Sequence, residues 1–525
     1  MKQLNYKPGE FAKLLNVSVL TLQRWDNDRK LVAYRTPTNR RYYTHQQYLD
    51  YIAKSKNSSQ QRRKVFGNEE AQERGSLWIG IEKESEQPKV LTSWQRRCHM
   101  LLLGPTGGGK FALTQLPMIL QDIREPNRSF VYLDENEDQA LTVYAAARHE
   151  EQQVVYINPL QAKSLRWNLL EGEVESVIET FINAFNLLLP QKENFFRDSS
   201  LKALKQGILA LKLLYGDMAD VSDLLAILAD KKRGAVQLVS ALEQFESEDQ
   251  DQEKVCREVL YYFKKNYYRF IYEENSEDAT QFHHAELARD FLQLLLANES
   301  VKTFLTLTEE ESVEGLNFET LLENGTSIVF CQPSFLVKTK RQQVKIGKMM
   351  EQYQLNEDLI FKALLTSRLS LALKTRTQIQ ASDRHPVSIY LEEPFLFNAR
   401  RLFESLIKGS NMEVTYHISC ESLAALKIEE SYSKNFLEQE AYLDIFQHQF
   451  IFPGVSQADR KVLEEQHQQE IRSIVSNLSV GEVLYYWCGE GALSHEVLQL
   501  NFIDEALNRR LEVLKYQFVL DRANR

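Results

Sequence analysis

Residues 99–113 read HMLLLGPTGGGKFAL, and this stretch decides the fold of the chain. The apolar run that ends at Leu103 predicts a buried strand, and the residues from Phe111 onward predict a helix. Between them, glycines allow successive backbone N–H groups to turn inward around phosphate groups, and the start of the helix favours negative charge. Lys110 stands where it can reach the outer phosphates. The stretch therefore predicts a strand, a phosphate-wrapping loop and a helix.

This pattern is the P-loop of nucleotide-binding proteins, and the flanking strand and helix support it. The predicted nucleotide-binding residues are Gly104, Pro105, Thr106, Gly107, Gly108, Gly109, Lys110 and Phe111. The last of them departs from the pattern, because a Ser or Thr hydroxyl that holds magnesium usually follows the lysine. We therefore expect ATP to bind, with Mg²⁺ at a weakened site.

Further strands follow the loop. Residues 129–134 (SFVYLD) and 154–157 (VVYI) are apolar runs separated by a predicted helix, and such strand–helix–strand units indicate a parallel sheet. Residues 174–313 carry leucines at helical spacing and predict an all-helical insert. Residues 318–330 then predict a helix, a glycine turn and another strand of the sheet.

A later strand ends in two acids. Residues 387–391 are mostly apolar and are followed by Glu392 and Glu393. At this place in the chain, Glu392 is predicted to bind Mg²⁺ and Glu393 to polarise the attacking water, which makes both candidate catalytic residues together with Lys110. The alternative for two acids after a strand is an ordinary surface turn.

The order of these features resembles the type IV coupling proteins of conjugation, the TraG/TraD-like DNA-transfer ATPases. The resemblance rests on the loop, a strand that ends at Asp134, a helix with Arg148 and a strand that runs into Asn158-Pro159. It implies a RecA-like P-loop NTPase sheet with an inserted helical domain, a homo-oligomer (a hexamer in that family), and single-stranded DNA and a relaxase as partners.

The same resemblance implies that several catalytic positions of the family are substituted in this chain. Glu392 stands where the family has Asp, and residues 408–410 (KGS) replace the family's Gly-Arg, whose arginine acts on a neighbouring subunit's nucleotide. Glu421 and Ala425 replace both glutamines of a sensor segment, which makes Glu421 a further candidate catalytic residue. Loss of an arginine finger alone costs roughly 10³–10⁵ in rate, so we expect weak or absent hydrolysis.

The N-terminal segment has the opposite charge to the rest of the chain. Residues 1–65 hold 14 Lys and Arg against 4 Asp and Glu, whereas the whole chain has a net charge of −10. Such a local basic segment is typical of a contact with nucleic acid, since neutralising phosphates needs local charge. Chance clustering on a solvated surface is the alternative.

The basic N-terminal segment also has the sequence pattern of a small folded domain. Residues 7–15 and 19–26 predict two helices joined by a turn, with Val19 and Leu22 buried in the second helix. A two-stranded wing over residues 31–43 and a helix from His45 to about Lys54 follow. The unit resembles the MerR-type winged helix-turn-helix, which implies binding to double-stranded DNA; protein contact alone is the alternative. The candidate DNA-binding residues are Thr21, Gln23, Arg24, Arg35, Arg40 and Arg41.

The chain as a whole is predicted to have an N-terminal DNA-binding domain (1–55), a basic linker (56–73), a first nucleotide-binding part (74–173), the insert (174–313) and a second nucleotide-binding part with a C-terminal helix (314–525). Five scattered cysteines without CxxC spacing and the lack of a long apolar run indicate a cytoplasmic protein. Two functions remain open. One is a coupling-type DNA-transfer protein, and the other is a non-catalytic P-loop scaffold or regulator for site-specific DNA binding in mobile-element maintenance or transcription control.

Overall fold

The computed structural model separates the chain into two compact units, Met1–Arg74 and Gly75–Arg525. The residues that it describes are 5–6, 8–15, 19–27, 29, 31–35, 41–44, 47, 75–161, 165–189, 195–273, 280–307, 314–332, 355–380, 383–392, 412–426, 443–468, 471–489, 494–500 and 503–523.

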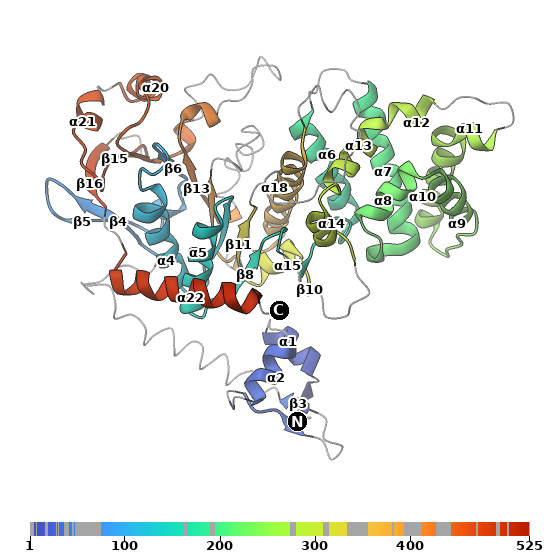
Figure 1. Cartoon of the computed structure of the whole chain (residues 1–525), viewed down its shortest axis with the longest axis horizontal. Helices are drawn as coiled ribbons and strands as arrows, with labels where there is room; N and C mark the ends of the chain where they lie inside the picture. The colour runs from blue at the N-terminus through green and yellow to red at the C-terminus, as the bar shows by residue number, and fades with distance from the viewer. Residues whose placement is uncertain are drawn as a thin grey trace. The chain divides into compact units, whose positions relative to one another are not determined.

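An 11-stranded sheet forms the centre of the second unit (Figure 1). Its strands lie in the order β5 (Pro88–Leu91), β4 (Leu77–Glu82), β16 (Ser494–Gln499), β15 (Glu482–Trp487), β14 (His448–Ile451), β6 (Met100–Leu103), β13 (Val414–Cys420), β12 (Val387–Glu392), β7 (Ser129–Asp134), β11 (Ser327–Cys331) and β8 (Val154–Ile157). Neighbours from β14 to β8 pair in parallel, whereas β15, β16, β4 and β5 extend the sheet by antiparallel pairs. The predicted parallel sheet is confirmed, with an antiparallel edge in addition.

The strands β6, β7 and β11 are buried along their whole length, which explains why they are mostly apolar runs. Along β6, Leu101 and Leu103 belong to one hydrophobic cluster, while Met100 and Leu102 belong to another. The second cluster includes residues of three helices that cover one face: α4 (Leu116–Arg124), α5 (Glu137–His149) and α22 (Glu505–Ala523). The first includes residues of α6 (Val174–Leu188) and α18 (Glu357–Thr375) on the other face.

A helical insert separates the two halves of the sheet. Its described residues form α6, α7 (Phe195–Tyr215), α8 (Val221–Ala229), α9 (Val239–Glu243), α10 (Gln250–Tyr261), α11 (Arg269–Tyr272), α12 (Thr280–His284), α13 (Glu286–Leu295) and α14 (Glu299–Leu305). Two short parallel strands, β9 (Leu165–Arg166) and β10 (Glu314–Gly315), pair where the insert leaves and rejoins the sheet. The predicted return follows as α15 (Phe318–Glu323), a turn at Gly325 with φ +67°, and β11. Two further helices, α20 (Gln457–His467) and α21 (Arg472–Ser476), lie between β14 and β15.

The first unit has the two predicted helices, α1 (Pro8–Leu15) and α2 (Val19–Asn27). A three-stranded sheet accompanies them, in the order β1 (Asn5–Tyr6), β3 (Arg41–Thr44) and β2 (Tyr34–Arg35). In the core, the ring of Phe11 stacks on that of Tyr43, with centroids 4.5 Å apart, and Leu22 is fully buried. Val19 was expected to be buried but is 38% exposed, because it begins its helix at the margin of this small core. The predicted third helix lies almost entirely outside the described residues.

Candidate nucleotide and DNA sites

The P-loop leaves the sheet at the carboxyl end of β6, between β13 and β14. The backbone N–H of Gly104 donates to the carbonyl of Cys420 at 3.1 Å, which ties the start of the loop to the neighbouring strand. A Cβ on Gly104 would lie 2.5 Å from the Cβ of Phe452, so only glycine fits there. Gly107 and Gly109 have φ values of +75° and +91°, a region that favours glycine. These glycines are therefore needed for the shape of the loop.

Lys110 is buried inside the loop. Its Nζ donates to the carbonyl oxygens of Gly104, at 2.5 Å, and Pro105, at 3.1 Å. Both acceptors belong to the loop itself, so the ammonium group is held at the centre of the turn that the glycines make. This is the position from which it can meet a phosphate oxygen.

The helix after the loop does not begin as expected. The prediction was a regular helix from Phe111, but Lys110–Gln115 form a π-helical turn before α4 begins at Leu116. The wider turn takes one more residue than an α-helical turn, and such turns occur often at functional sites. The ring of Phe111 lies beside that of Tyr132, with centroids 6.0 Å apart. The position after the lysine thus carries an aromatic contact instead of a hydroxyl.

Glu392 ends β12 two strands away from the loop strand, and its backbone is in register with Ser419 on β13. Burial raises the pKa of the Glu392 carboxyl to about 8, with a further rise from the charge of Asp134. Ser419, Lys110 and Gln115 act in the opposite direction and lower it. This acid therefore lies near enough to the P-loop lysine to be affected by its charge, and its role as a magnesium ligand stays a prediction.

Asp134 ends the next strand, β7, and sequence reasoning did not nominate it. Leu391 and Leu133 are paired in register, so the following residues, Glu392 and Asp134, end adjacent strands. Asp134 accepts hydrogen bonds from the Tyr132 hydroxyl at 2.8 Å and from the Asn136 backbone at 2.9 Å. Burial nevertheless raises its pKa to about 6. The only sequence signal was an acid at a strand end, which becomes informative once the strand order is known.

Several buried polar side chains around this edge have no hydrogen-bond partner among the described residues. They include Glu392 Oε1, Ser419 Oγ, Thr114 Oγ1 and both amide atoms of Gln115. Ser419 and Gln115 are both 0% exposed. They come near enough to Glu392 to lower its pKa without reaching hydrogen-bond geometry. Since buried polar groups are normally paired, these atoms suit a polar ligand. No sequence signal distinguished Gln115 or Ser419.

Two further residues were predicted to be catalytic, and their roles stay predictions. Glu421 follows β13 and is exposed, and Glu393 lies outside the described residues. Within the described ranges, no group of three or more His, Cys, Asp or Glu side chains could hold a metal ion by itself. An ion held by one carboxylate, phosphates and water needs no such group.

In the first unit, Arg24 is exposed and Gln23 partly exposed on α2, and Thr21 lies between them and the start of the same helix. Arg35 and Arg41 are different, because both donate to Oδ2 of Asp26, at 3.0 and 2.7 Å.

Asp26 connects α2 to both strands of the wing, since its Oδ1 also accepts the backbone N–H of Ala33 at 2.9 Å. Burial works to raise the pKa of Asp26, but the hydrogen bonds from Arg41 and Ala33 and the charges of both arginines hold it below its usual value. Two of the predicted DNA contacts therefore also stabilise the fold of the unit. Arg40 lies outside the described residues.

Sequence comparison finds two protein families that match parts of the chain. Residues 7–43 match the MerR family regulatory proteins, and residues 47–282 match the family of type IV secretory system conjugative DNA transfer. Over these ranges the chain is similar to MerR regulators and to proteins of conjugative DNA transfer. No curated protein matches its sequence.

Solved structures similar to this chain include two of one coupling protein. The bacterial conjugative coupling protein TrwBdeltaN70 is 12% identical, with a TM-score of 0.48 over 83% of this chain and 92% of that one. TrwB in complex with ADP and Mg²⁺ is 11% identical, with a TM-score of 0.48 over 83% and 91%. VirB4 of Thermoanaerobacter pseudethanolicus is 11% identical, with a TM-score of 0.47 over 83% and 100%.

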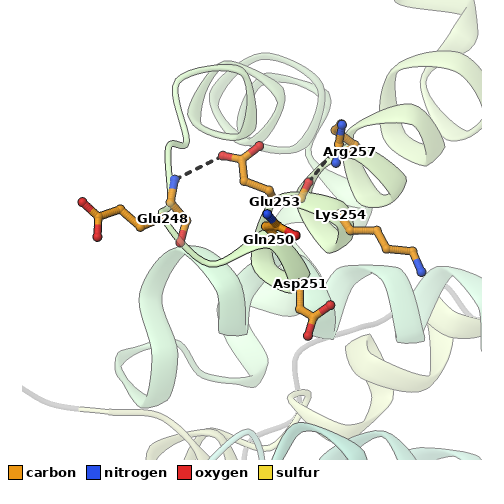
Figure 2. A pocket seen from close by; sticks show the side chains of 7 residues that line it. Glu248, Gln250, Asp251, Glu253, Lys254 and Arg257 are labelled. Carbon is orange, nitrogen blue, oxygen red and sulfur yellow. Dashed lines mark hydrogen bonds between the residues drawn. The ribbon is translucent and has the colours of Figure 1, made fainter.

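The helical insert has a shallow pocket at the start of α10 (Figure 2). Its lining residues are Ser247, Glu248, Gln250, Asp251, Glu253, Lys254 and Arg257. Glu253 accepts from the Ser247 backbone at 3.1 Å, and Arg257 donates to the Glu253 carbonyl at 3.3 Å. The first contact stabilises the turn before the helix and the second lies within the helix, and we assign no ligand to the pocket. Among the helices of the described residues, none has the length and apolar character to cross a membrane.

Proposed function

We propose that this chain is a coupling-type protein that binds ATP with Mg²⁺ at the P-loop and double-stranded DNA through its head, the unit Met1–Arg74, and that it hydrolyses ATP slowly. The observation that carries the nucleotide part is the position of Lys110, which lies inside a glycine loop at the carboxyl edge of the sheet, next to Glu392. Ligands of open parallel sheets bind outside this edge.

Different groups of the chain bind the phosphates and the Mg²⁺ ion in this proposal. The backbone N–H groups of residues 106, 107, 109 and 110 surround the phosphates, while that of Gly108 donates to the Pro105 carbonyl at 3.0 Å inside the loop. The start of the helical segment favours the negative charge of the phosphates. Lys110 exchanges the Gly104 and Pro105 carbonyls for phosphate oxygens, which are stronger acceptors for an ammonium group. Glu392, with its unpartnered Oε1, fits an ion held by a carboxylate, phosphates and water. Bound Mg²⁺ supplies positive charge that neutralises the phosphates.

Two features of the same site support slow hydrolysis, namely the missing hydroxyl at residue 111 and the raised pKa of Glu392. Phe111 has no hydroxyl with which to hold the metal beside the lysine. Burial and the neighbouring Asp134 raise the pKa of Glu392 to about 8, which disfavours the charged carboxylate that a metal prefers. These two features weaken the placement of the ion without affecting the phosphate loop.

The head supplies the proposed DNA contact. Its α2 exposes Arg24 and partly exposes Gln23, side chains that bond base edges or phosphates in a major groove. The surrounding segment is rich in cations, which supports binding to the phosphate backbone. The other proposed partners are further copies of this chain, a relaxase and single-stranded DNA.

Titration with a fluorescent ADP tests the nucleotide part. Lys110→Ala should weaken binding by at least about tenfold, because it removes a charged hydrogen bond to the phosphates. Lys461→Ala, at an exposed position on α20, is the matched control and should bind like the parent. Equal affinity of all three proteins would exclude the P-loop as the site.

An ATPase assay with and without DNA tests the slow turnover. We expect less than about 1 s⁻¹ in both conditions, below the usual range of enzymes. DNA-stimulated turnover at or above about 1 s⁻¹ would show that the active site is competent.

A further inference from the structure

Gln115 is the most unusual polar residue near the P-loop. Its side chain is 0% exposed, and neither its Nε2 nor its Oε1 has a hydrogen-bond partner among the described residues. Burying an amide without a partner is unfavourable, so such a group in a folded protein needs an explanation. Its position next to the loop points to a ligand that completes its hydrogen bonds.

A second glutamine on the same helical segment shows what a purely structural amide looks like here. Gln121 accepts the backbone N–H of Trp78 at 2.9 Å and donates to the carbonyls of Trp78, at 3.0 Å, and Pro117, at 3.1 Å. Its amide therefore connects α4 to β4 with every contact made inside the protein. Gln115 makes none of these contacts, although both residues belong to the segment that follows the loop.

The π-helical turn accounts for where Gln115 lies. The N–H of Leu116 bonds to the carbonyl of Phe111, five residues back, so Lys110–Gln115 form one wide turn. Gln115 is its last residue, and its amide comes close enough to Glu392 to lower the pKa of that carboxyl. Ser419, on the strand between Glu392 and the loop, approaches the same carboxyl. The two buried side chains thus face Glu392 from different elements.

We propose that Gln115 compensates for the hydroxyl that Phe111 lacks, by orienting the Glu392 carboxylate and offering an amide oxygen to the hydrated Mg²⁺ that accompanies the nucleotide. An amide suits both tasks, because it donates through nitrogen and accepts through oxygen, and amide oxygens are acceptable to hard cations. Gln115 is in this sense a positioning residue. The inference rests on the proposed binding of a magnesium nucleotide.

The test compares ADP affinity in Mg²⁺ with ADP affinity in EDTA. For the parent protein, Mg²⁺ should tighten binding. Gln115→Met, which keeps the length of the side chain, should reduce this enhancement by about tenfold or more, as expected for residues that support metal ligands, while affinity in EDTA stays unchanged. Gln121→Met is the matched control, and it should lower the melting temperature while the full enhancement remains.

The conservative variant Gln115→Asn keeps an amide but draws it back from Glu392, so it should give an intermediate loss and keep the fold. Adding Phe111→Ser to Gln115→Met should restore the enhancement, because a hydroxyl returns next to the lysine. A merely structural glutamine would not respond to this second substitution.

The outcomes separate the two proposals. If the parent binds ADP and both Gln115 variants keep the full enhancement, the role of Gln115 is wrong while nucleotide binding stands. An equal loss of affinity in Mg²⁺ and in EDTA also overturns it, because it indicates damage to the pocket in general. If the parent binds no ADP in either condition, the proposed function itself fails, and the role of Gln115 fails with it.

Discussion

Phe111 directly follows the P-loop lysine, and its ring is packed near Tyr132 with 6.0 Å between centroids. The aromatic contact stabilises the first turn after the loop but supplies no atom that a cation can use. The hydroxyl of Tyr132 is already committed to Asp134 at 2.8 Å. Whether the position after the lysine can hold a cation therefore depends on the side chain of residue 111, and a single substitution there can change it.

Phe111→Ser should strengthen the effect of Mg²⁺ on ADP binding by about tenfold, since it places a hydroxyl where a metal-bound nucleotide can use it. The comparison of ADP affinity in Mg²⁺ and in EDTA measures this. Phe111→Ala is the control, because it removes the same ring without adding an oxygen. If Ser and Ala behave alike, the missing hydroxyl is not what weakens the metal site.

Gly107 and Gly109 differ in what surrounds them, although both have positive φ. A Cβ on Gly107 would meet nothing within 4 Å, whereas one on Gly109 would lie 2.6 Å from Cδ1 of Leu113. At the scale of the element, Gly109 therefore decides whether the loop can join the π-helical turn. Gly107 is needed only for the backbone conformation of the loop.

Gly107→Ala should cost about 1–2 kcal/mol of backbone strain and weaken ADP binding modestly. Gly109→Ala should bring the same strain together with the clash against Leu113, and ADP affinity should fall at least about tenfold further than in Gly107→Ala. Parallel ADP titrations, with circular dichroism to confirm folding, provide the measurement. Equal effects would mean that the turn tolerates a shift of Leu113.

Two buried histidines lie on β13 and β14, the strands on either side of β6. Burial lowers the pKa of His417 to about 3 and that of His448 to about 4, even though His448 contacts the Gln95 carbonyl and the Tyr485 hydroxyl at 2.8 Å each. Both are therefore neutral in the folded protein at pH 5, while in the unfolded chain they are protonated below about pH 6.5. At these two residues the unfolded state binds more protons in this range, so their contribution to stability falls as the pH drops from about 6.5 towards 4.

At pH 5, each histidine should reduce the free energy of unfolding by about 2 kcal/mol relative to pH 8. Urea unfolding at both pH values measures this loss. His448→Gln removes one titrating group, so its change in stability between pH 8 and pH 5 should be about 2 kcal/mol less unfavourable than that of the parent, whatever its effect at pH 8. A variant that loses as much stability between pH 8 and pH 5 as the parent would contradict the assignment.

The sequence could predict the elements of the site better than its contacts. Apolar runs next to the loop and before Glu392 identified β6 and β12, because strands buried on both faces show no alternation. The approach of Asp134 and Glu392 could not be predicted, since it depends on the order of strands in the sheet. Gln115 was hidden for another reason: a regular helix from Phe111 was the natural expectation, and the π-helical turn changes the direction of every side chain that follows.

Across the whole molecule, the insert separates in sequence what the sheet brings together in space. The loop and Asp134 precede the insert, whereas Glu392 and Ser419 follow it by many residues. Parallel pairing in the order β6, β13, β12 and β7 places all of them at one edge. The small pairing of β9 with β10 joins the two ends of the insert, so a helical domain can be accommodated without moving the site.

At the scale of the whole molecule, the contrast between a basic N-terminal segment and a chain of net charge −10 predicts how DNA binding depends on salt. Each cation that neutralises a phosphate contributes about −0.9 to the slope of log affinity against log salt concentration. Arg24 is exposed, whereas Arg35 is held by Asp26 at 3.0 Å. Arg24→Ala should therefore reduce the steepness of the slope by about 0.9 and weaken binding to every duplex tested.

Arg35→Ala is the matched control within the same head, because it removes an equal charge that Asp26 already neutralises in part. Its slope should change less than that of Arg24→Ala, and its main effect should be a lower melting temperature of the head, since it breaks one link between α2 and the wing. Anisotropy titrations of a labelled duplex at several salt concentrations measure the slopes. If the acidic body rather than the head governed binding, neither substitution would change the slope, and the head would have to be a protein-contact module instead.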